Sequence, residues 1–439
     1  MSSQPAWVDH AIWWHIYPLG FVGAPVHDWD GGSLEDEHRL HRIVDWFDYA
    51  VELGASGIAL GPIFASASHG YDTIDHLRID SRLGTEADFD DMIHQAHSRG
   101  LRVMLDGVFN HVAQAFPRFV QALEAGPDSP ESEWFHLDWS GARPTHRNFE
   151  GHDELVTLNH DSVEVEQYVV DVMSHWLERG ADGWRLDAAY AVPPRFWAAV
   201  IPKVRQKFPD AYFLGEVIHG DYAAIVKASS LDSVTQYELW KASWSAISER
   251  NFFELSHALG RHNEWLETFV PATFVGNHDV ARIASTITDE RHLEHALVVL
   301  FTVGGMPMIY YGDEQGFRGA KEERVGGDDE VRPEFPSSRE ELAPYGWPTF
   351  HLHQELIGFR RRHPWLVEAR TETVELSNTA MLYRVHSGDE QLHVALNLGD
   401  DEVTYRIGGD VFAGEILAGE AHAGGGSTRI PPHGWVVLR

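Results

Sequence analysis

The stretch GADGWRLDAAY (residues 180–190) joins a predicted helix to a predicted strand. Residues 165–176 repeat apolar side chains at the spacing of an amphipathic helix, and a glycine ends that pattern. The next residues, Gly183–Leu186, are typical of a short buried strand. Because side chains alternate along a strand, Arg185 and Asp187 lie on the same face at its end. A helix followed at once by such a strand is the repeating unit of parallel β/α folds.

The same alternation of a short apolar run and a longer helical pattern recurs through the first 315 residues. One further helix begins with the capping-box spacing of Thr85 and Asp88 and leads into the run LRVMLD (101–106). Eight strands are the number that a closed (β/α)8 TIM barrel requires, so we expect an α/β fold of that kind. The predicted strands are Ile12–Tyr17, Gly57–Leu60, Arg102–Asp106, Gly183–Leu186, Ala211–Leu214, Ser233–Thr235, Thr273–Val275 and Met308–Tyr311.

Two segments interrupt this alternation and define the expected domains. Residues 112–159 are rich in Pro, Gly, Ser, Trp and Asp and follow the third strand, which favours a small inserted subdomain over a simple loop. Residues 366–439 contain short alternating runs such as MLYRV and GWVVL, which favour a C-terminal antiparallel β-sandwich. The catalytic barrel is then expected to comprise residues 1–111 and 160–365, with a loop at 317–347 beside its mouth.

Composition limits the classes of partner. The 439 residues carry a formal net charge of −33, which disfavours nucleic acid and anionic lipid. The sequence has no apolar run of membrane-spanning length and no start typical of a secretion signal, so we expect no membrane partner and a cytoplasmic location. It has no cysteine, which excludes disulfides and thiolate metal sites. These features leave the oligomeric state unknown.

Polar residues follow four of the predicted strands, at the end of the barrel where the chemistry of such folds takes place. Carboxylates brought together repel one another, which raises the pKa of at least one and creates an acid–base pair. Glycoside hydrolysis needs such a pair. One carboxylate alone is more often a surface group or a helix cap, but four strand ends of this kind favour an active site. The residues are Asp106, Asn110, His111, Arg185, Asp187, Glu216, Asn277, His278 and Asp279.

Several motifs together resemble those of the α-amylase family of glycoside hydrolases (family 13). Each motif alone is weak, whereas five in the family's order along nearly the whole chain are specific. The stretch LGPIFASASHGYDTIDHLRID (60–80) is similar to the cyclomaltodextrinase, neopullulanase and maltogenic amylase group within that family. The five motifs are DGVFNH (106–111), GWRLDAA (183–189), GEV (215–217), FVGNHD (274–279) and GMPMIYYGDEQG (305–316).

The resemblance implies a role for each residue of the expected site. Asp187 would be the nucleophile, Glu216 the general acid and then base, and Asp279 the stabiliser of the transition state. Arg185 would orient Asp187 and keep it ionised. Family members retain the anomeric configuration, so the two catalytic carboxyl groups should lie about 5–5.5 Å apart. The expected substrate-binding residues are Tyr71, Asp106, His111, Arg185, Tyr190, His278 and Arg282, with Tyr71 stacking on the sugar ring.

Some positions depart from the family pattern or have two interpretations. The chain begins almost directly at the first predicted strand, so the N-terminal β domain of the similar group is expected to be absent. Tyr190 stands where many amylases have Lys, and either stacks on the leaving sugar or packs within its loop. Gly276 stands where amylases often have Glu, which favours small substrates. Arg282, three residues after Asp279, either reaches the mouth or pairs with a nearby acidic residue.

The expected function is retaining hydrolysis of α-glucosidic bonds in maltooligosaccharides or in short or cyclic α-glucans, with an oligosaccharide as the partner. The alternative is an α-glucosyltransferase or isomerase, because a sugar can intercept the same covalent intermediate. A scaffold protein is disfavoured because all three carboxylates are present. No cofactor is expected to be required. Calcium stays open, with Asn110 as a candidate ligand, although the acidic run HDWDGG (27–32) lacks the spacing of calcium loops.

Overall fold

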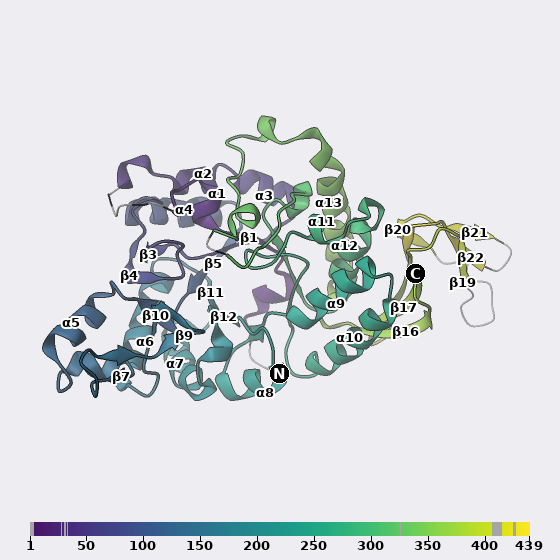
Figure 1. The fold of residues 1–439 in the computed structure, drawn as a ribbon. Coiled ribbons are helices and arrows are strands. Elements are labelled where there is room, and N and C mark those ends of the chain that lie inside the picture. The colour runs from purple at the N-terminus through teal and green to yellow at the C-terminus, as the bar shows by residue number, and fades with distance from the viewer. Residues whose placement is uncertain are drawn as a thin grey trace.

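The computed structural model describes residues 4–27, 29, 32, 34–324, 326–405, 415–424 and 427–439. A β/α barrel lies at the centre, with a smaller lobe on one side and antiparallel sheets at the C-terminal end (Figure 1). The run HDWDGG lies partly outside the described residues, and so does the end of the alternating run VTYRI (403–407), which belongs to the expected C-terminal β-sandwich.

Eight parallel strands form the barrel, as predicted from the sequence. Their order in the sheet is β13-β12-β11-β5-β2-β1-β15-β14, and a parallel bridge from Thr235 to Ala272 joins the two ends of this order. The predicted strands differ from the observed ones by no more than two residues at any end. The observed strands are β1 (Trp13–Ile16), β2 (Gly57–Leu60), β5 (Arg102–Gly107), β11 (Gly183–Leu186), β12 (Tyr212–Gly215), β13 (Ser233–Val234), β14 (Ala272–Phe274) and β15 (Met306–Tyr310).

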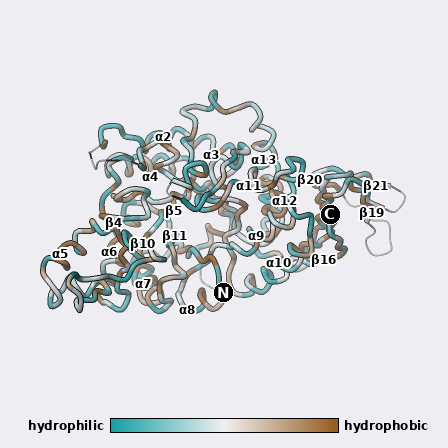
Figure 2. Tube along the Cα trace, viewed as in Figure 1, coloured by the Kyte–Doolittle hydropathy of each residue, from teal (hydrophilic) through white to brown (hydrophobic). Residues whose placement is uncertain are grey.

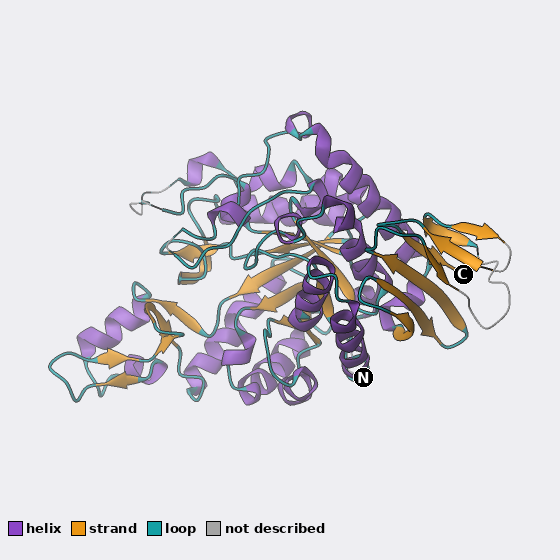
Figure 3. Cartoon of the chain, turned by 45° about the vertical axis from the view of Figure 1, so that its right-hand side comes forward, coloured by secondary structure: helices purple, strands orange, loops and turns teal. Residues whose placement is uncertain are grey.

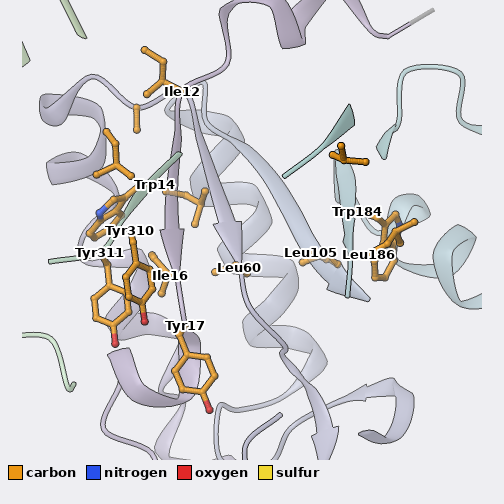
Figure 4. Packing of buried hydrophobic residues seen from close by; sticks show 14 of the residues in the cluster. Ile12, Trp14, Ile16, Tyr17, Leu60, Leu105, Trp184, Leu186, Tyr310 and Tyr311 are labelled. Atoms are coloured by element: carbon orange, nitrogen blue, oxygen red, sulfur yellow. The ribbon is translucent and has the colours of Figure 1, made fainter. Parts of the chain in front are cut away.

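Side chains of these strands alternate between the inside of the barrel and the layer under the helices. Figure 4 shows part of the outer layer, including Trp14, Leu60 and Leu105. The inner register includes Asp106 near the end of β5 and, one residue past the end of β12, Glu216, so the fold itself aims these carboxylates at the barrel mouth. The inner cluster includes Trp13, Ala59, Met104, Tyr212, Leu214, Ala272, Phe274, Met306 and Met308.

Helices cover the outside of the barrel, and in Figure 2 hydrophobic and hydrophilic segments alternate along them. The predicted capping box is present at the start of α4, where Thr85 and Asp88 each accept a hydrogen bond from the other's backbone N–H. Among the described residues, no helix has both the length and the apolar character needed to cross a bilayer. The helices are α1 (Pro18–Phe21), α2 (Leu40–Val44), α3 (Phe47–Leu53), α4 (Glu86–Ser98), α6 (Val163–Glu178), α7 (Pro194–Lys207), α8 (Tyr222–Ser229), α9 (Tyr237–Ser248), α10 (Phe252–Trp265), α11 (Ile283–Thr286), α12 (Leu293–Thr302) and α13 (Trp347–Arg362).

The segment after β5 forms the small lobe, which lies at the lower left in Figure 3. Its main sheet has the order β6-β10-β9. The N–H of Leu158 donates to the carbonyl of Asn110 at 3.0 Å and ties the end of the lobe to the barrel. The lobe contains β6 (His111–Ala113), α5 (Pro117–Ala125), η3 (Pro130–Trp134), β7 (Leu137–Asp138), β8 (Thr145–His146), β9 (Asn148–Phe149) and β10 (His152–Thr157).

The sequence patterns do not predict the antiparallel hairpin of β3 (Phe64–Ser66) and β4 (Thr73–Ile79), which follows the second barrel strand. A buried ion pair braces the hairpin, because Arg82 Nε donates to Asp80 Oδ1 at 2.8 Å. The other oxygen of Asp80 accepts the backbone N–H of Ser66 at 3.1 Å. Tyr71 lies in the turn between the two strands, so the hairpin fixes its position.

The C-terminal segment forms two antiparallel sheets, which confirms the predicted β-sandwich. The larger sheet has the order β16-β17-β18-β23-β20 and the smaller one β19-β22-β21. On β17, Met381 and Tyr383 join the core shared with the barrel, whereas Leu382 joins Tyr405 and Ile430 of the smaller sheet. The larger sheet is therefore buried on both faces. The strands are β16 (Arg370–Leu376), β17 (Ala380–Ser387), β18 (Glu390–Asn397), β19 (Val403–Tyr405), β20 (Ile416–Gly419), β21 (His422–Gly424), β22 (Ser427–Ile430) and β23 (Trp435–Leu438).

Short 3-10 helices occupy the connections, including the loop at 317–347. They are η1 (Ala6–His10), η2 (Glu35–Glu37), η4 (Ala189–Ala191), η5 (Glu290–His292), η6 (Asp313–Gln315), η7 (Asp329–Val331), η8 (Arg339–Glu341), η9 (Pro344–Gly346) and η10 (Pro364–Glu368).

Glu314 in η6 is a fully buried carboxyl group. It accepts hydrogen bonds from Tyr49 Oη at 3.0 Å and from the N–H of Gly312 at 2.9 Å. Burial raises the pKa of Glu314 from its ordinary value of 4.5 to about 7. Because the folded pKa lies above the unfolded one, folding takes up a proton between these values, and the stability that this contributes is lost as the pH rises from 4.5 through 7.

We therefore expect Glu314→Gln to raise the melting temperature by about 2 °C at pH 8 and to give no gain at pH 4.5. At pH 8 the wild type carries a buried charge that the amide lacks. Scanning calorimetry at the two pH values measures the difference. A gain of equal size at both would show that ionisation of Glu314 is not the cause.

Candidate active site

Three adjacent strands bring the predicted charged residues together. Asp106 lies near the end of β5, Arg185 and Asp187 lie at the end of β11, and Glu216 follows β12. All four side chains are buried. The convergence at one mouth that was predicted from the strand ends is therefore present for these residues.

Arg185 is the centre of this cluster. Its Nη1 donates to both oxygens of Asp106, at 2.8 and 2.7 Å, and to Asp187 Oδ1 at 3.0 Å. Its Nη2 lies 2.5 Å from Glu216 Oε1. One guanidinium group thus pairs with three carboxylates, and Asp187 and Glu216 contact different terminal nitrogens of that group.

Two further donors orient Glu216. The N–H of Ala188 donates to Oε2 at 3.0 Å, and the hydroxyl of Tyr237 donates to Oε1 at 3.2 Å. Ala188 has φ 43° and ψ 39°, a left-handed conformation that turns the chain directly after Asp187. This conformation costs a non-glycine residue about 1–2 kcal/mol. The surrounding packing holds Ala188 in it, and the turn aims the N–H at Glu216.

The carboxylates outnumber the cation, and this governs their pKa values. Burial raises the pKa of Asp106 to about 6, against the opposing effect of Arg185. Burial also raises the pKa of Asp187 well above its ordinary value, with Glu216 and Asp106 adding to the effect. Arg185 opposes this rise, because its positive charge favours the ionised form of Asp187, but it is shared by three carboxylates. The cluster retains protons that isolated carboxyl groups would lose.

Aromatic rings line one side of the cluster. The ring of His278 is nearly parallel to those of Tyr71 and Tyr17, with centroids 5.1 and 6.3 Å away. The Tyr71 hydroxyl lies 2.5 Å from His278 Nε2 and donates to Asp106 Oδ2 at 3.2 Å. Burial lowers the pKa of His278 well below its ordinary value, so the ring is neutral. Its Nδ1 is buried and has no hydrogen-bond partner among the described residues.

Asp279 has cations of its own. Lys321 Nζ lies 3.1 Å and Arg332 Nη2 lies 3.2 Å from its Oδ1, and both cations also pair with Asp328. Burial raises the pKa of Asp279, but Lys321 and Arg332 reverse this effect, and the net pKa lies below the ordinary value. Both cations belong to the loop at 317–347, which the sequence analysis predicted beside the mouth. The carboxylates of the site are therefore unequal, and Asp279 is the one held ionised.

His111 and Asn110 are buried under the small lobe. His111 Nε2 donates to the carbonyl of Tyr71 at 3.0 Å, and its ring stacks on Phe149 at 4.7 Å. The side-chain amide of Asn110 donates to His111 Nδ1 at 3.0 Å. Calcium takes six to eight oxygen ligands. The described contacts of Asn110 include no carboxylate, and calcium at this residue stays an untested expectation.

Tyr190 lies at the rim of the site, and Arg282 lies outside it. The hydroxyl of Tyr190 donates at 2.7 Å to Glu150 of the small lobe. Of the two alternatives for Arg282, the structure shows the ion pair: its Nη1 lies 3.0 Å from Asp313 Oδ1, and its side chain is fully buried. Arg282 therefore does not join the mouth residues. The expectation that it binds substrate is corrected, because η6 supplies it with a buried partner.

Sequence reasoning missed Tyr17, Tyr237, Lys321 and Arg332. Tyr237 is the first residue of α9, which follows β13 after two residues. Its place close behind a barrel strand is a signal that would have found it. Lys321 and Arg332 lie in a loop without periodic pattern, so the sequence carries no signal that places them on Asp279.

A narrow pocket of about 20 Å³ adjoins the cluster and extends into the barrel. Polar groups converge at its wall above an apolar floor, which is the usual character of a site for small ligands. Its wall includes Asp106, Arg185, Glu216, Tyr237, Asn277 and His278, and its floor includes Ala59, Leu214, Phe274 and Met308.

A β/α barrel with buried carboxylates clustered at the C-terminal ends of its strands defines an enzyme equipped for acid–base and nucleophilic chemistry. Comparison with known families identifies the family. Residues 16–382 match the description "Alpha amylase, catalytic domain", so the chain belongs to the α-amylase family and is a glycoside hydrolase. This confirms the family predicted from the five motifs.

Relatives and solved structures match along most of the chain. A maltogenic alpha-amylase of Bacillus acidopullulyticus is 32% identical over 415 residues, which cover 89% of this chain and 67% of that protein. A cyclomaltodextrinase of Geobacillus thermopakistaniensis is 29% identical over 473 residues, covering 100% and 78%. The native debranching enzyme of Nostoc punctiforme has a TM-score of 0.85 at 26% identity, covering 100% and 99%. The names of the first two relatives agree with the group that LGPIFASASHGYDTIDHLRID indicated.

Proposed function

We propose that the enzyme hydrolyses α-glucosidic bonds with retention of configuration, using Asp187 as nucleophile and Glu216 as acid and base. The observation that carries this proposal is the pairing of the two carboxylates on one guanidinium, Asp187 on Nη1 at 3.0 Å and Glu216 on Nη2 at 2.5 Å. A retaining glycosidase needs its two carboxyl groups about 5–5.5 Å apart, because one of them bonds directly to the sugar, and a shared guanidinium keeps the two groups near each other.

In the first step, an oxygen of Asp187 bonds to the anomeric carbon as the bond to the leaving-group oxygen breaks. Glu216 donates its proton to the leaving-group oxygen, so the leaving sugar departs as a neutral alcohol. In the second step, water attacks the anomeric carbon, Glu216 takes the water proton, and Asp187 leaves as a carboxylate. The positive charge that develops on the ring is stabilised by the ionised Asp279.

The remaining residues would bind the sugar. His278 lines the pocket beside the carboxylates, and the ring of Tyr71 offers a stacking face. Tyr190, held by Glu150 at the rim, would contact the leaving sugar. No step requires a cofactor or a metal ion.

The proposed substrates are maltooligosaccharides and cyclic or short α-glucans. The relatives named as maltogenic amylase and cyclomaltodextrinase support this choice. A Cβ built at Gly276 would lie 2.2 Å from Asp313 Oδ2, so a glutamate at this position would require the Asp313 side chain to move.

The test is a time course with maltotriose and α-, β- and γ-cyclodextrin, followed by proton NMR of the anomeric signals and by chromatography. We expect the α-anomer of the new reducing end to appear first and the β-anomer to follow by mutarotation. A β-anomer formed first would contradict the retaining mechanism. Disaccharide rearrangement of sucrose or trehalose without net release of glucose would instead support the alternative, a transferase or isomerase of the same family.

We also expect Lys321→Met to move the acid limb of the pH–kcat/KM profile to higher pH and to lower kcat/KM about tenfold at pH 5. Lys321 lowers the pKa of Asp279, so its removal lets Asp279 take up a proton at a higher pH and lose the charge that stabilises the transition state. Lys241→Met is the matched control, because Lys241 pairs with Glu254 on the outer helices. Superimposable profiles for Lys321→Met and the wild type would rule out this role.

A further inference from the structure

Two imidazole rings meet where the C-terminal sheets join the barrel. His292 ends η5, directly before α12, and His433 lies in the turn before β23. His292 Nε2 and His433 Nδ1 are 2.9 Å apart. The two rings come from residues far apart in the sequence, on the side of the molecule where α12 approaches the C-terminal sheets (Figure 1). Neither residue takes part in the proposed reaction.

One carboxylate lies near each of the two imidazole rings. Asp289 Oδ2 lies 3.8 Å from His292 Nδ1, and Asp400 Oδ1 lies 3.1 Å from His433 Nε2. Among the described residues, Asp289, His292 and His433 are the only group of three histidine or acidic side chains whose ligand atoms all lie within 4.8 Å of one another. The cluster therefore combines imidazole nitrogens with carboxylate oxygens.

Hydrogen bonding sets which ring nitrogens are free to bind. Asp400 accepts the Nε2 hydrogen of His433, so His433 Nδ1 carries a lone pair that points at His292. If His292 carries its hydrogen on Nδ1, its Nε2 also presents a lone pair. His433 would then have the carboxylate of Asp400 behind it, the arrangement that orients histidine ligands in protein metal sites, and Asp289 would be left to bind the ion. The side chain of His292 is buried, so its ring is held in place.

We propose that His292 and His433, with Asp289 as a third ligand, bind a divalent transition-metal ion of the zinc class. Imidazole nitrogen suits zinc, nickel and copper, whereas magnesium and calcium prefer oxygen. Zinc–nitrogen bonds of about 2.0–2.1 Å place two tetrahedral ligands about 3.3 Å apart, close to the observed separation of the two nitrogens. Water would complete the coordination.

Neighbouring cations moderate the affinity of this site. Arg291 donates to both oxygens of Asp289, at 2.9 and 2.7 Å, and Arg250 lies 3.8 Å from Asp400. Asp289 must therefore share its oxygens between Arg291 and the ion. The bound ion would link the start of α12 to the turn before β23. It would therefore stabilise the junction of the barrel and the C-terminal sheets, and catalytic activity would not depend on it.

The test uses the apo protein, the whole chain, and Zn²⁺ as the probe. We expect equilibrium dialysis to show one more bound zinc per chain in the wild type than in His433→Asn. We also expect zinc, and not Mg²⁺, to raise the melting temperature of the wild type by about 2 °C and to leave that of the variant unchanged. Asparagine is chosen because His433 has φ 56°, a conformation that asparagine tolerates.

Asp400→Asn gives a second and milder test, because Asp400 is 74% exposed and its loss does not disturb the core. We expect this variant to bind zinc about tenfold more weakly. The chain has 28 histidines, so His386→Gln on β17 is the control for zinc bound elsewhere, and it should match the wild type. Equal stoichiometry and equal melting shifts in the wild type and His433→Asn would overturn the proposal and leave the two rings as a hydrogen-bonded pair.

Discussion

Asp187→Asn is expected to lower kcat/KM by at least about 10⁴-fold and to leave the melting temperature at pH 7 equal to or above that of the wild type. The amide cannot form the glycosyl-enzyme bond, so the loss falls on kcat. It keeps an oxygen that can accept the hydrogen bond from Arg185, so the cluster retains this contact. Activity on maltotriose and calorimetry of the same samples measure the two effects.

The direction of the stability change follows from the pKa of Asp187. Burial raises the folded pKa of Asp187 above its unfolded value, so the stability contributed by its proton is present at low pH and lost as the pH rises. Asparagine does not titrate. The melting temperature of the variant relative to the wild type should therefore be higher at pH 7 than at pH 4.

Asp182→Asn is the matched control. Asp182 directly precedes β11, the strand that Asp187 follows, and pairs with Arg102 at 2.6 Å and with His97 at 2.9 Å. This variant should lower the melting temperature and keep kcat/KM within a few-fold of the wild type. A large fall in melting temperature for Asp187→Asn, comparable with that of Asp182→Asn, would assign Asp187 to the fold and contradict the catalytic role.

The barrel and the central residues of the site could be predicted because both follow from local patterns. Strand alternation alone places Arg185 and Asp187 on one face, and the eightfold repeat brings neighbouring strand ends together. The hairpin of β3 and β4 could not be predicted this way, because the contacts that brace it, from Ser66 to Asp80 and from Arg82 to the carbonyl of Pro25, join residues far apart in the sequence. The same holds for Arg282, whose choice between the mouth and Asp313 depends on the path of the chain after β15.

Electrostatics was the less predictable part of the site. The residue types show that carboxylates outnumber cations at the mouth, but they do not show which carboxylate each cation reaches. In the structure, Arg185 is divided among three carboxylates, whereas Asp279 has two cations. The pKa of Asp187 is therefore raised and that of Asp279 lowered, a difference that the strand-end pattern does not contain.

The second large effect is expected for Arg185→Met, which should lower kcat/KM by about 10³-fold and the melting temperature at pH 7 by about 5 °C. The change leaves Asp106, Asp187 and Glu216 buried together without their shared cation. Removing one partner of a buried ionic cluster costs about 3–5 kcal/mol, because the remaining charges lose their compensation and stay out of water. Steady-state kinetics and calorimetry measure the two losses.

The pH dependence separates this explanation from a simple loss of packing. Without Arg185 the folded pKa values of Asp106 and Asp187 rise further, so their protons contribute stability at pH 4 that is lost as the pH increases to 7. The melting temperatures of variant and wild type should therefore approach each other at pH 4. The double variant Arg185→Met with Asp106→Asn should recover part of the melting temperature at pH 7, because it removes one uncompensated charge, and should remain inactive.

Arg282→Met supplies the matched control, because Arg282 is also a buried arginine but pairs with one carboxylate, Asp313. It should destabilise the fold with a smaller dependence on pH, since one charge is left uncompensated where Arg185→Met leaves three. If Arg185→Met lowered the melting temperature equally at pH 4 and pH 7, its contribution would be one of packing. The charge-sharing that underlies the proposed acid–base pair of Asp187 and Glu216 would then lose its support.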